Sequence, residues 1–216
     1  MNWLAPRSDF FVAQDAFDLE VARDYLNRIL TLGQDAARGF HHPDLKPNRF
    51  HPKPKYPVDR YMCLGLYWNP LDYRYYPQGP GEVTPHAIDP WLQDLGAAVV
   101  AECFPDVVGW RAEAVIVNYY TKGRKMSWHT DKEELDRVAP VVGINFGSTA
   151  KFYFETPSGE EASVLIPGNS VYCFGGTARQ MRHAVGAGRA KSLSFESAGL
   201  LGSGERLNLT LRKVWA

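Results

Sequence analysis

Hydrophobic residues follow two different spacings along this chain. Across residues 15–32 they recur at intervals of three and four, which predicts an amphipathic helix that ends at Gly33. Residues 89–104 predict a second helix, because Pro90 suits a first helical turn and Pro105 follows the last apolar residue. The buried stripe expected for this second helix consists of Trp91, Leu95, Ala98 and Val99.

After Trp110 the pattern changes to short strands separated by turns rich in glycine and proline. The predicted strands are 112–120, 141–146, 151–154, 163–166, 171–174 and 206–212. Evenly spaced short strands with few helices predict a mainly-β protein, most simply a jelly roll with an N-terminal α/β extension. We expect residues 1–110 and 111–216 to form one integrated domain, in which the second part is the β core.

The last predicted strand, 206–212, has the most regular alternation. Its three leucines point to one side, while Arg206, Asn208, Thr210 and Arg212 point to the other. A surface strand would give the same pattern. Two permanently charged, forked guanidinium groups on one face of the strand would also suit the binding of an acid with a carboxylate at each end.

A possible metal site lies upstream of this strand. His129 and Asp131 are two residues apart, so on an extended segment both side chains point to the same side. This pair alone is weak evidence, because a polar loop would also contain it. His183 follows the Gly175-Gly176 turn and is the natural third ligand. Two histidines and one carboxylate form the facial triad of non-haem Fe(II) oxygenases, which accept a 2-oxo acid and O2.

These residues resemble the AlkB-type 2-oxoglutarate- and Fe(II)-dependent dioxygenases. The resemblance covers residues 110–216 and follows Asn118-Tyr119-Tyr120, His129-x-Asp131, Arg179-x-x-x-His183 and the alternating strand 206–212. It implies a double-stranded β-helix in which His129, Asp131 and His183 hold iron. It also implies a 2-oxoglutarate site, whose residues would be Asn118, Tyr120, Arg206, Asn208 and Arg212. Which arginine takes which carboxylate stays open.

The resemblance further implies a reaction and a substrate. Family members oxidise N-methyl groups on nucleobases with Fe(II), O2 and 2-oxoglutarate, releasing succinate, CO2 and formaldehyde. Their repair and demethylation substrates are alkylated DNA or RNA, and a single strand is preferred where a base must leave its stack. Three short segments are more similar to the family branch that acts on tRNA and methyladenine than to the enterobacterial DNA-repair enzyme. They are residues 111–114, 118–120 and 134–136.

The sequence also contains candidate substrate residues. The family's aromatic and basic lid corresponds to residues 67–76, where Tyr73 is the best stacking candidate and Trp68 could equally pack against the barrel. Glu133 and Arg179 are expected to contact substrate, although Glu133 lies in a charged run that would also suit an exposed surface.

Composition adds a few limits. The chain has 216 residues, with 24 basic and 24 acidic side chains, so its net charge favours no partner. Residues 38–60 are locally basic, which suits either phosphate contacts or a solvated loop. Three cysteines without a paired spacing, no signal-peptide pattern and no long apolar run lead us to expect a soluble cytoplasmic protein that does not contact membranes.

Two alternatives remain at this stage. The same chemistry could act on a protein side chain or a small molecule. Alternatively, a non-catalytic jelly roll could hold a structural zinc, although such a site needs no pair of arginines and usually has four protein ligands. Protein partners, oligomeric state and the preferred methylated base are not encoded in any motif we recognise.

Overall fold

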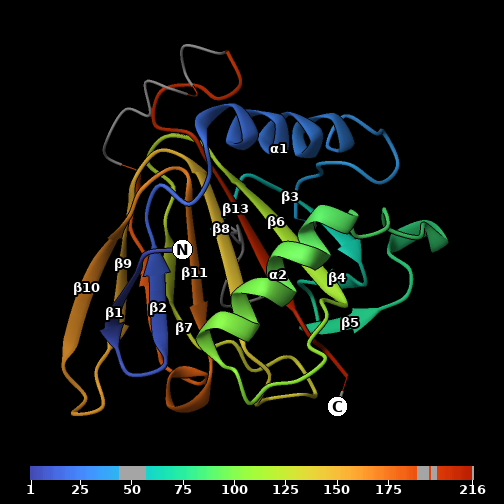
Figure 1. The fold of residues 1–216 in the computed structure, drawn as a ribbon. Helices are drawn as coiled ribbons and strands as arrows, with labels where there is room; N and C mark the ends of the chain where they lie inside the picture. The colour runs from blue at the N-terminus through green and yellow to red at the C-terminus, as the bar shows by residue number, and fades with distance from the viewer. Residues whose placement is uncertain (44–56, 189–194, 196–198, 216) are drawn as a thin grey trace, which may run out of the picture.

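A computed structural model describes residues 1–43, 57–188, 195 and 199–215. Its largest element is a seven-stranded antiparallel sheet (Figure 1). In spatial order this major sheet contains β1 (Trp3–Arg7), β2 (Phe10–Ala13), β11 (Ser170–Phe174), β8 (Val141–Gly147), β13 (Arg206–Arg212), β6 (Ala114–Tyr120) and β3 (Arg60–Gly65).

A smaller antiparallel sheet faces one end of the major sheet. It contains β10 (Glu161–Ile166), β9 (Ala150–Glu155), β12 (His183–Val185) and β7 (Met126–His129). Aromatic side chains fill the space between the sheets, where Phe10 of β2 lies 5.1 Å from Phe152 of β9 between ring centroids. Two facing antiparallel sheets with this topology form the jelly roll, or double-stranded β-helix, that the strand pattern predicted.

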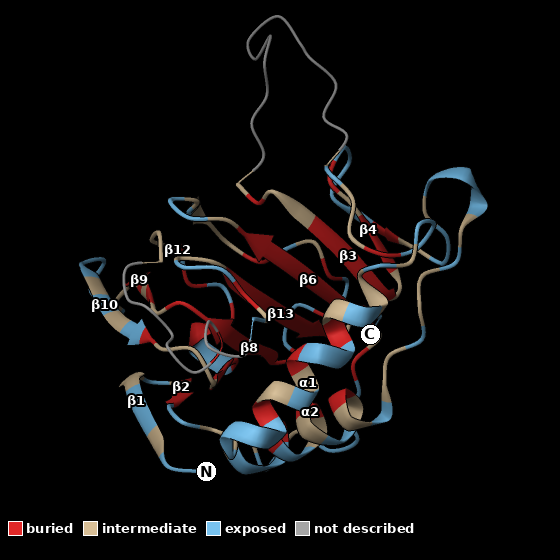
Figure 2. Ribbon diagram, turned by 90° about the horizontal axis from the view of Figure 1, so that it is seen from above, coloured by how far each residue is buried: buried red, intermediate tan, exposed pale blue. Residues whose placement is uncertain are grey.

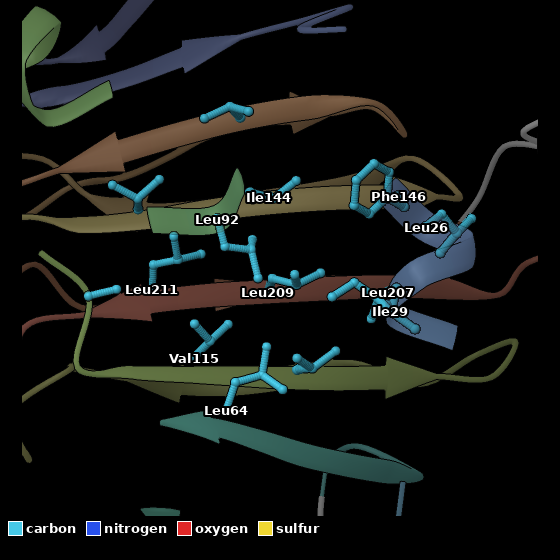
Figure 3. Packing of buried hydrophobic residues seen from close by; sticks show 14 of the residues in the cluster. Leu26, Ile29, Leu64, Leu92, Val115, Ile144, Phe146, Leu207, Leu209 and Leu211 are labelled. Atoms are coloured by element: carbon cyan, nitrogen blue, oxygen red, sulfur yellow. The ribbon is translucent and has the colours of Figure 1, made fainter. Parts of the chain in front are cut away.

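Two helices cover the outer face of the major sheet. They are α1 (Leu19–Leu32) and α2 (Pro90–Cys103), close to the predicted ranges. Figure 3 shows Leu26 and Ile29 of α1 and Leu92 of α2 against Leu207, Leu209 and Leu211 of β13. The leucine face of β13 therefore lies under the helices, which stabilise it by burial of apolar surface. None of the described helices is long and apolar enough to cross a bilayer.

The predicted buried stripe of α2 was right at Val99 and wrong at Ala98, while Trp91 and Leu95 are partly buried against the core. Its buried residues are Leu92, Gly96, Val99 and Val100, whereas Ala98 is exposed. The reason is a close approach at Gly96, where a Cβ atom would lie 2.7 Å from Trp110 and 3.0 Å from Leu211. Glycine lets the helix axis come near β13, and this rotates Trp91 to the flank, where it stacks on Tyr25.

The N-terminal region contributes more strand than expected. β1 and β2 extend one edge of the major sheet, because β2 pairs with β11. β3 forms the opposite edge by pairing with β6, and the hairpin of β4 (Tyr67–Asn69) and β5 (Arg74–Tyr76) follows it. Two short 3₁₀ turns, η1 (Pro80–Glu82) and η2 (Gly176–Ala178), complete the described elements. Figure 2 shows that the central strands β6, β13 and β8 are buried, while α1 exposes its outer face.

Candidate active site

The three predicted metal ligands meet at the mouth of the barrel. His129 ends β7 and His183 begins β12, and the two are opposite one another in the strand register. Asp131 lies just beyond β7. The candidate ligand atoms of the three side chains all lie within 4.8 Å of one another. Asp131 and His183 are buried, whereas His129 is partly open to solvent.

Both imidazoles are oriented by backbone carbonyl groups. Nδ1 of His129 donates to the carbonyl of Ser127 at 2.8 Å, and Nδ1 of His183 donates to that of Met181 at 3.1 Å. A carbonyl oxygen can only accept, so each Nδ1 carries the proton and each Nε2 presents a lone pair. Nε2 of His129 lies 3.7 Å from Oδ1 of Asp131. Two imidazole nitrogens and one carboxylate oxygen thus form the ligand set of a non-haem Fe(II) site.

Electrostatics also favour the ligand forms of these groups. Burial lowers the pKa of His183 to about 4, so its imidazole is neutral at neutral pH. Burial by itself would raise the pKa of Asp131, but the adjacent Arg212 and the two histidines hold it well below its usual range. The site therefore offers an ionised carboxylate and a neutral buried imidazole, which is the state that binds a divalent metal.

Arg212 lies directly beside the metal carboxylate. Its Nη2 is 3.0 Å from Oδ1 of Asp131, and its Nη1 donates to Oε1 of Glu134. Although burial alone would lower the pKa of Arg212, these two carboxylates raise it well above its usual value. This arginine is consequently a fixed cation next to the triad.

Glu134 connects several groups behind the triad and was not predicted as a site residue. Its carboxylate is 1% exposed and accepts from Arg212, from Nη2 of Arg179 at 2.9 Å and from the hydroxyl of Tyr75 at 2.6 Å. Burial alone would raise the pKa of Glu134, but Arg212 lowers it below the usual value. The sequence signals were its position three residues after Asp131 and the family-like segment 134–136, but an acidic run equally suits a solvent-exposed loop.

Arg179 has a different position from the one expected for a substrate contact. It is 2% exposed, and each nitrogen of its guanidinium group donates to the protein. Nε donates to the carbonyl of Ala139 at 2.7 Å, Nη1 to that of Asp131 at 2.6 Å, and Nη2 to Glu134. These bonds fix the backbone of the metal aspartate, so the geometry favours a positioning role over contact with substrate.

The other arginine of β13, Arg206, has no acidic partner among the residues that the structure describes. Arg206 is 3% exposed and lies over the ring of Tyr120, with 4.0 Å between its Cζ and the ring centroid. Its Nε and Nη2 are buried without a hydrogen-bond partner among the described residues. Burial lowers the pKa of Arg206, yet the group stays far above neutral and keeps its charge. An unpaired buried cation of this kind is costly unless an anion joins it.

The remaining residues implied for 2-oxoglutarate lie around Arg206 on adjacent strands. In the register of β6 and β13, Tyr120 is opposite Arg206 and Asn118 is opposite Asn208. Directly opposed residues project to the same face of a sheet. Nδ2 of Asn208 donates to the hydroxyl of Tyr172 at 3.1 Å, which adds a residue of β11 that we had not predicted. Together with Arg212, these polar groups fit a dicarboxylic acid held beside a metal.

The predicted substrate residues lie farther out. Tyr73 is exposed at the tip of the β4–β5 hairpin, and it shares a groove of about 960 Å³ with Glu133. Trp68 is buried and makes edge-on contacts with Tyr61 and Tyr73, which favours the packing interpretation.

The predicted basic segment 38–60 lies mostly outside the described residues, which omit 44–56. Its two described arginines both have partners within the protein. Arg38 pairs with Asp35 at 2.7 Å, and Arg60 lies over the Tyr119 ring. The prediction that this segment contacts phosphates stays a prediction.

Similarity to known proteins agrees with this geometry. The family model described as the 2OG-Fe(II) oxygenase superfamily matches residues 14–212. The chain is 30% identical over 132 residues to tRNA demethylase abh1 of Schizosaccharomyces pombe, covering 59% of this chain and 44% of the relative. It is 31% identical over 129 residues to nucleic acid dioxygenase ALKBH1 of Homo sapiens, covering 58% and 31%. Alpha-ketoglutarate-dependent dioxygenase AlkB of Escherichia coli is 31% identical over 90 residues, covering 41% and 40%.

Each of these matches spans less than half of the relative's length. The solved structure of OsALKBH1 superimposes with a TM-score of 0.80 at 22% identity and covers 98% of this chain and 100% of that one, which shows the same fold. The donor set, the unpaired Arg206 and the matched family model agree with one another, and we conclude that this chain belongs to the 2OG-Fe(II) oxygenase superfamily.

Proposed function

We propose that this protein oxidatively demethylates N-alkylated bases in nucleic acid, using Fe(II), O2 and 2-oxoglutarate. The observation that carries the proposal is Arg206, an unpaired buried cation on the same face of β13 as Arg212, which contacts the metal aspartate. A structural zinc site needs no such cation. Bound at His129, Asp131 and His183, iron would supply the oxidation of a methyl group by O2, with 2-oxoglutarate converted to succinate and CO2 and the hydroxylated methyl group lost as formaldehyde.

The two arginines have separate roles in this proposal. Arg212 already pairs with Asp131 and Glu134, so it lies where the metal-proximal carboxylate of 2-oxoglutarate would bind. Arg206 has free donors and no acidic partner among the described residues, so we assign it the distal carboxylate. Asn208 and Tyr120 would line the same side of the 2-oxoglutarate site. The protein's contribution is to align the oxo acid and to exclude water from it.

Nucleic acid is the substrate best supported by the relatives. Their names include a tRNA demethylase, a nucleic acid dioxygenase and AlkB itself. We therefore propose tRNA as the first substrate to test, and we expect unpaired strands to react faster than a duplex. A base must leave its stack to reach a metal in a barrel, and an unpaired base does so at a lower cost.

The test is incubation of the iron-loaded protein with 2-oxoglutarate and a panel of methylated tRNA, single-stranded and duplex oligomers. We expect formaldehyde and loss of the methylated base, fastest with unpaired substrates, and no product from Asp131→Asn. If no methylated oligomer yields formaldehyde, the nucleic-acid proposal is wrong. Succinate formation that responds instead to a protein or a small molecule would identify the alternative substrate class.

We also propose that the protein works in a reducing cytoplasm. Cys63, Cys103 and Cys173 are all free, and the first and last are buried. Fractionation of cells that express a tagged protein at native level would test this location.

A further inference from the structure

β8 carries a single polar side chain, Asn145, and this side chain lies in the buried interior of the barrel. Ile144, the residue before it, packs on the helix-covered face of the major sheet (Figure 3), so Asn145 projects to the opposite face. Asn145 is 0% exposed and is directly opposite Asn208 of β13. It therefore lies on the face that holds the 2-oxoglutarate residues, although we had not predicted it as one of them.

The orientation of the Asn145 amide is fixed by its surroundings. Its Nδ2 donates to the carbonyl of Pro167 at 2.8 Å, and the hydroxyl of Ser170 donates to the same carbonyl. A carbonyl oxygen can only accept, so the amide group cannot be reversed and Oδ1 does not face Pro167. This Oδ1 is buried and has no hydrogen-bond partner among the described residues. A buried acceptor of this kind is costly unless a donor reaches it.

The strand register indicates that Arg206 is this donor. On the two strands that flank β8, the buried side-chain donors without a partner belong to Arg206 and Arg212, among the residues that the structure describes. Arg206 is two residues from Asn208, whereas Arg212 is four residues from it and is already paired with Asp131. Diagonal neighbours on one face of a sheet are within reach of a long side chain, so Arg206 can reach the Asn145 amide.

The chemistry of the site favours a neutral acceptor at this position. 2-Oxoglutarate offers only acceptors, which are its two carboxylates and its ketone, so the ligand itself cannot pair with Oδ1 of Asn145. An amide oxygen can accept from a guanidinium group and leave the positive charge in place. A carboxylate here would instead neutralise Arg206 and repel the carboxylate of the ligand. The residue directly opposite Arg206 on β8 is Gly147, so β8 places no side chain directly across from the guanidinium group.

We propose that Asn145 is a positioning residue for 2-oxoglutarate, whose Oδ1 accepts from the guanidinium group of Arg206 when the oxo acid is bound. The bond directs the remaining donors of Arg206 toward the distal carboxylate and keeps the charge of the guanidinium group available. The inference rests on the proposed assignment of Arg206 to that carboxylate, and it adds the group that orients this arginine.

A double-mutant cycle tests the coupling in the full chain loaded with Mn(II), with 2-oxoglutarate affinity measured by calorimetry. We expect Asn145→Ala to weaken binding about three-fold, the effect of losing one neutral hydrogen bond. Arg206→Met should weaken it at least about ten-fold, because a charge-assisted pair is lost. In the Arg206→Met background, Asn145→Ala should have no further effect, since the partner of the amide is already absent.

Ser170→Ala is the matched control for this cycle. It removes a bond to the same Pro167 carbonyl without removing the amide oxygen, so it should bind 2-oxoglutarate like the unaltered protein. Thermal unfolding of each metal-free variant reports any loss of folding.

A second arm combines a charged variant with a truncated ligand. Asn145→Asp places a carboxylate near Arg206 and should lower the affinity for 2-oxoglutarate at least about ten-fold. The affinity for 2-oxopentanoate, in which a methyl group replaces the distal carboxylate, should stay nearly unchanged. A merely structural role of Asn145 would lower the affinity for both ligands alike.

The outcomes distinguish this inference from the proposed function. If Asn145→Ala weakens binding equally with and without the Arg206 guanidinium group, its amide bonds another group, such as an ordered water, and the inference is overturned. Equal losses of affinity for the two ligands in Asn145→Asp would also overturn it. If Arg206→Met binds 2-oxoglutarate unchanged, the proposed role of Arg206 is wrong and the inference fails with it. Formaldehyde release from methylated oligomers decides the proposed reaction independently.

Discussion

Nη2 of Arg212 lies 3.0 Å from Oδ1 of Asp131, so the last residue of β13 is ion-paired with the carboxylate of the metal triad. Arg206, six residues earlier on the same face, has no acidic partner in the described parts of the chain. Two arginines that look equivalent in the sequence therefore differ in their surroundings. One belongs to a charge network around the metal, and the other is left for a ligand.

This difference predicts unequal effects of the two lysine substitutions. Arg206→Lys should lower 2-oxoglutarate affinity about ten-fold, or ~1.4 kcal/mol, because the bidentate fork is lost. Its melting temperature without ligand should change little. Arg212→Lys should weaken 2-oxoglutarate binding and also lower the melting temperature, because it disturbs a buried network. Calorimetry and thermal unfolding measure the two quantities; equal behaviour of both variants would refute the separate roles.

The assignment of the metal ligands is tested most directly at His129, because this ligand is partly open to solvent. His129→Ala should abolish metal binding and turnover while leaving the melting temperature of the metal-free protein almost unchanged, since little packing is removed. Metal titration and circular dichroism provide the readouts. His42→Ala, an exposed histidine outside the site, is the control. Retained tight metal binding by His129→Ala would exclude it as a ligand.

Glu134 should be important for stability as well as for the site. Glu134→Gln keeps the side-chain shape but removes the charge that Arg179 and Arg212 share, leaving two buried cations poorly compensated. We expect a loss of about 3 kcal/mol, the lower end for breaking a buried ion pair, and a melting temperature lower by roughly 10 °C. The exposed Glu160→Gln serves as control. A Glu134→Gln protein as stable as the unaltered one would show that the network contributes no net stability.

Gly143 lies on β8, directly beside Thr210 of β13, and tests how the neighbouring Tyr172 of β11 shapes the 2-oxoglutarate site. A Cβ atom there would lie 1.9 Å from Cζ of Tyr172, whose hydroxyl bonds Asn208. Gly143→Ala should displace this ring and reduce both stability and 2-oxoglutarate affinity. Adding Tyr172→Ala should restore space for the new methyl group and recover part of the stability, but not the affinity. Full affinity in the single variant would show that Tyr172 does not shape the oxo-acid site.

Local sequence determined a large part of this fold. Alternation in β13 identified its two faces correctly, because the period of a strand assigns every second side chain to the same environment. Helical spacing located α1 and α2 to within a few residues. The triad was visible since His129 and Asp131 are neighbours on one extended segment and His183 was the natural third ligand beyond a glycine turn.

Tertiary structure decided what each charged group touches. No spacing rule could show that Glu134 would be buried between Arg179 and Arg212, because a run of acidic residues is typical of a solvent-exposed loop. Likewise, β1 and β2 were missed, since their place at the sheet edge depends on pairing with β11, more than 150 residues away. Contacts of this kind arise from packing between distant segments, so the sequence determined which chemistry was available and the fold determined how it was arranged.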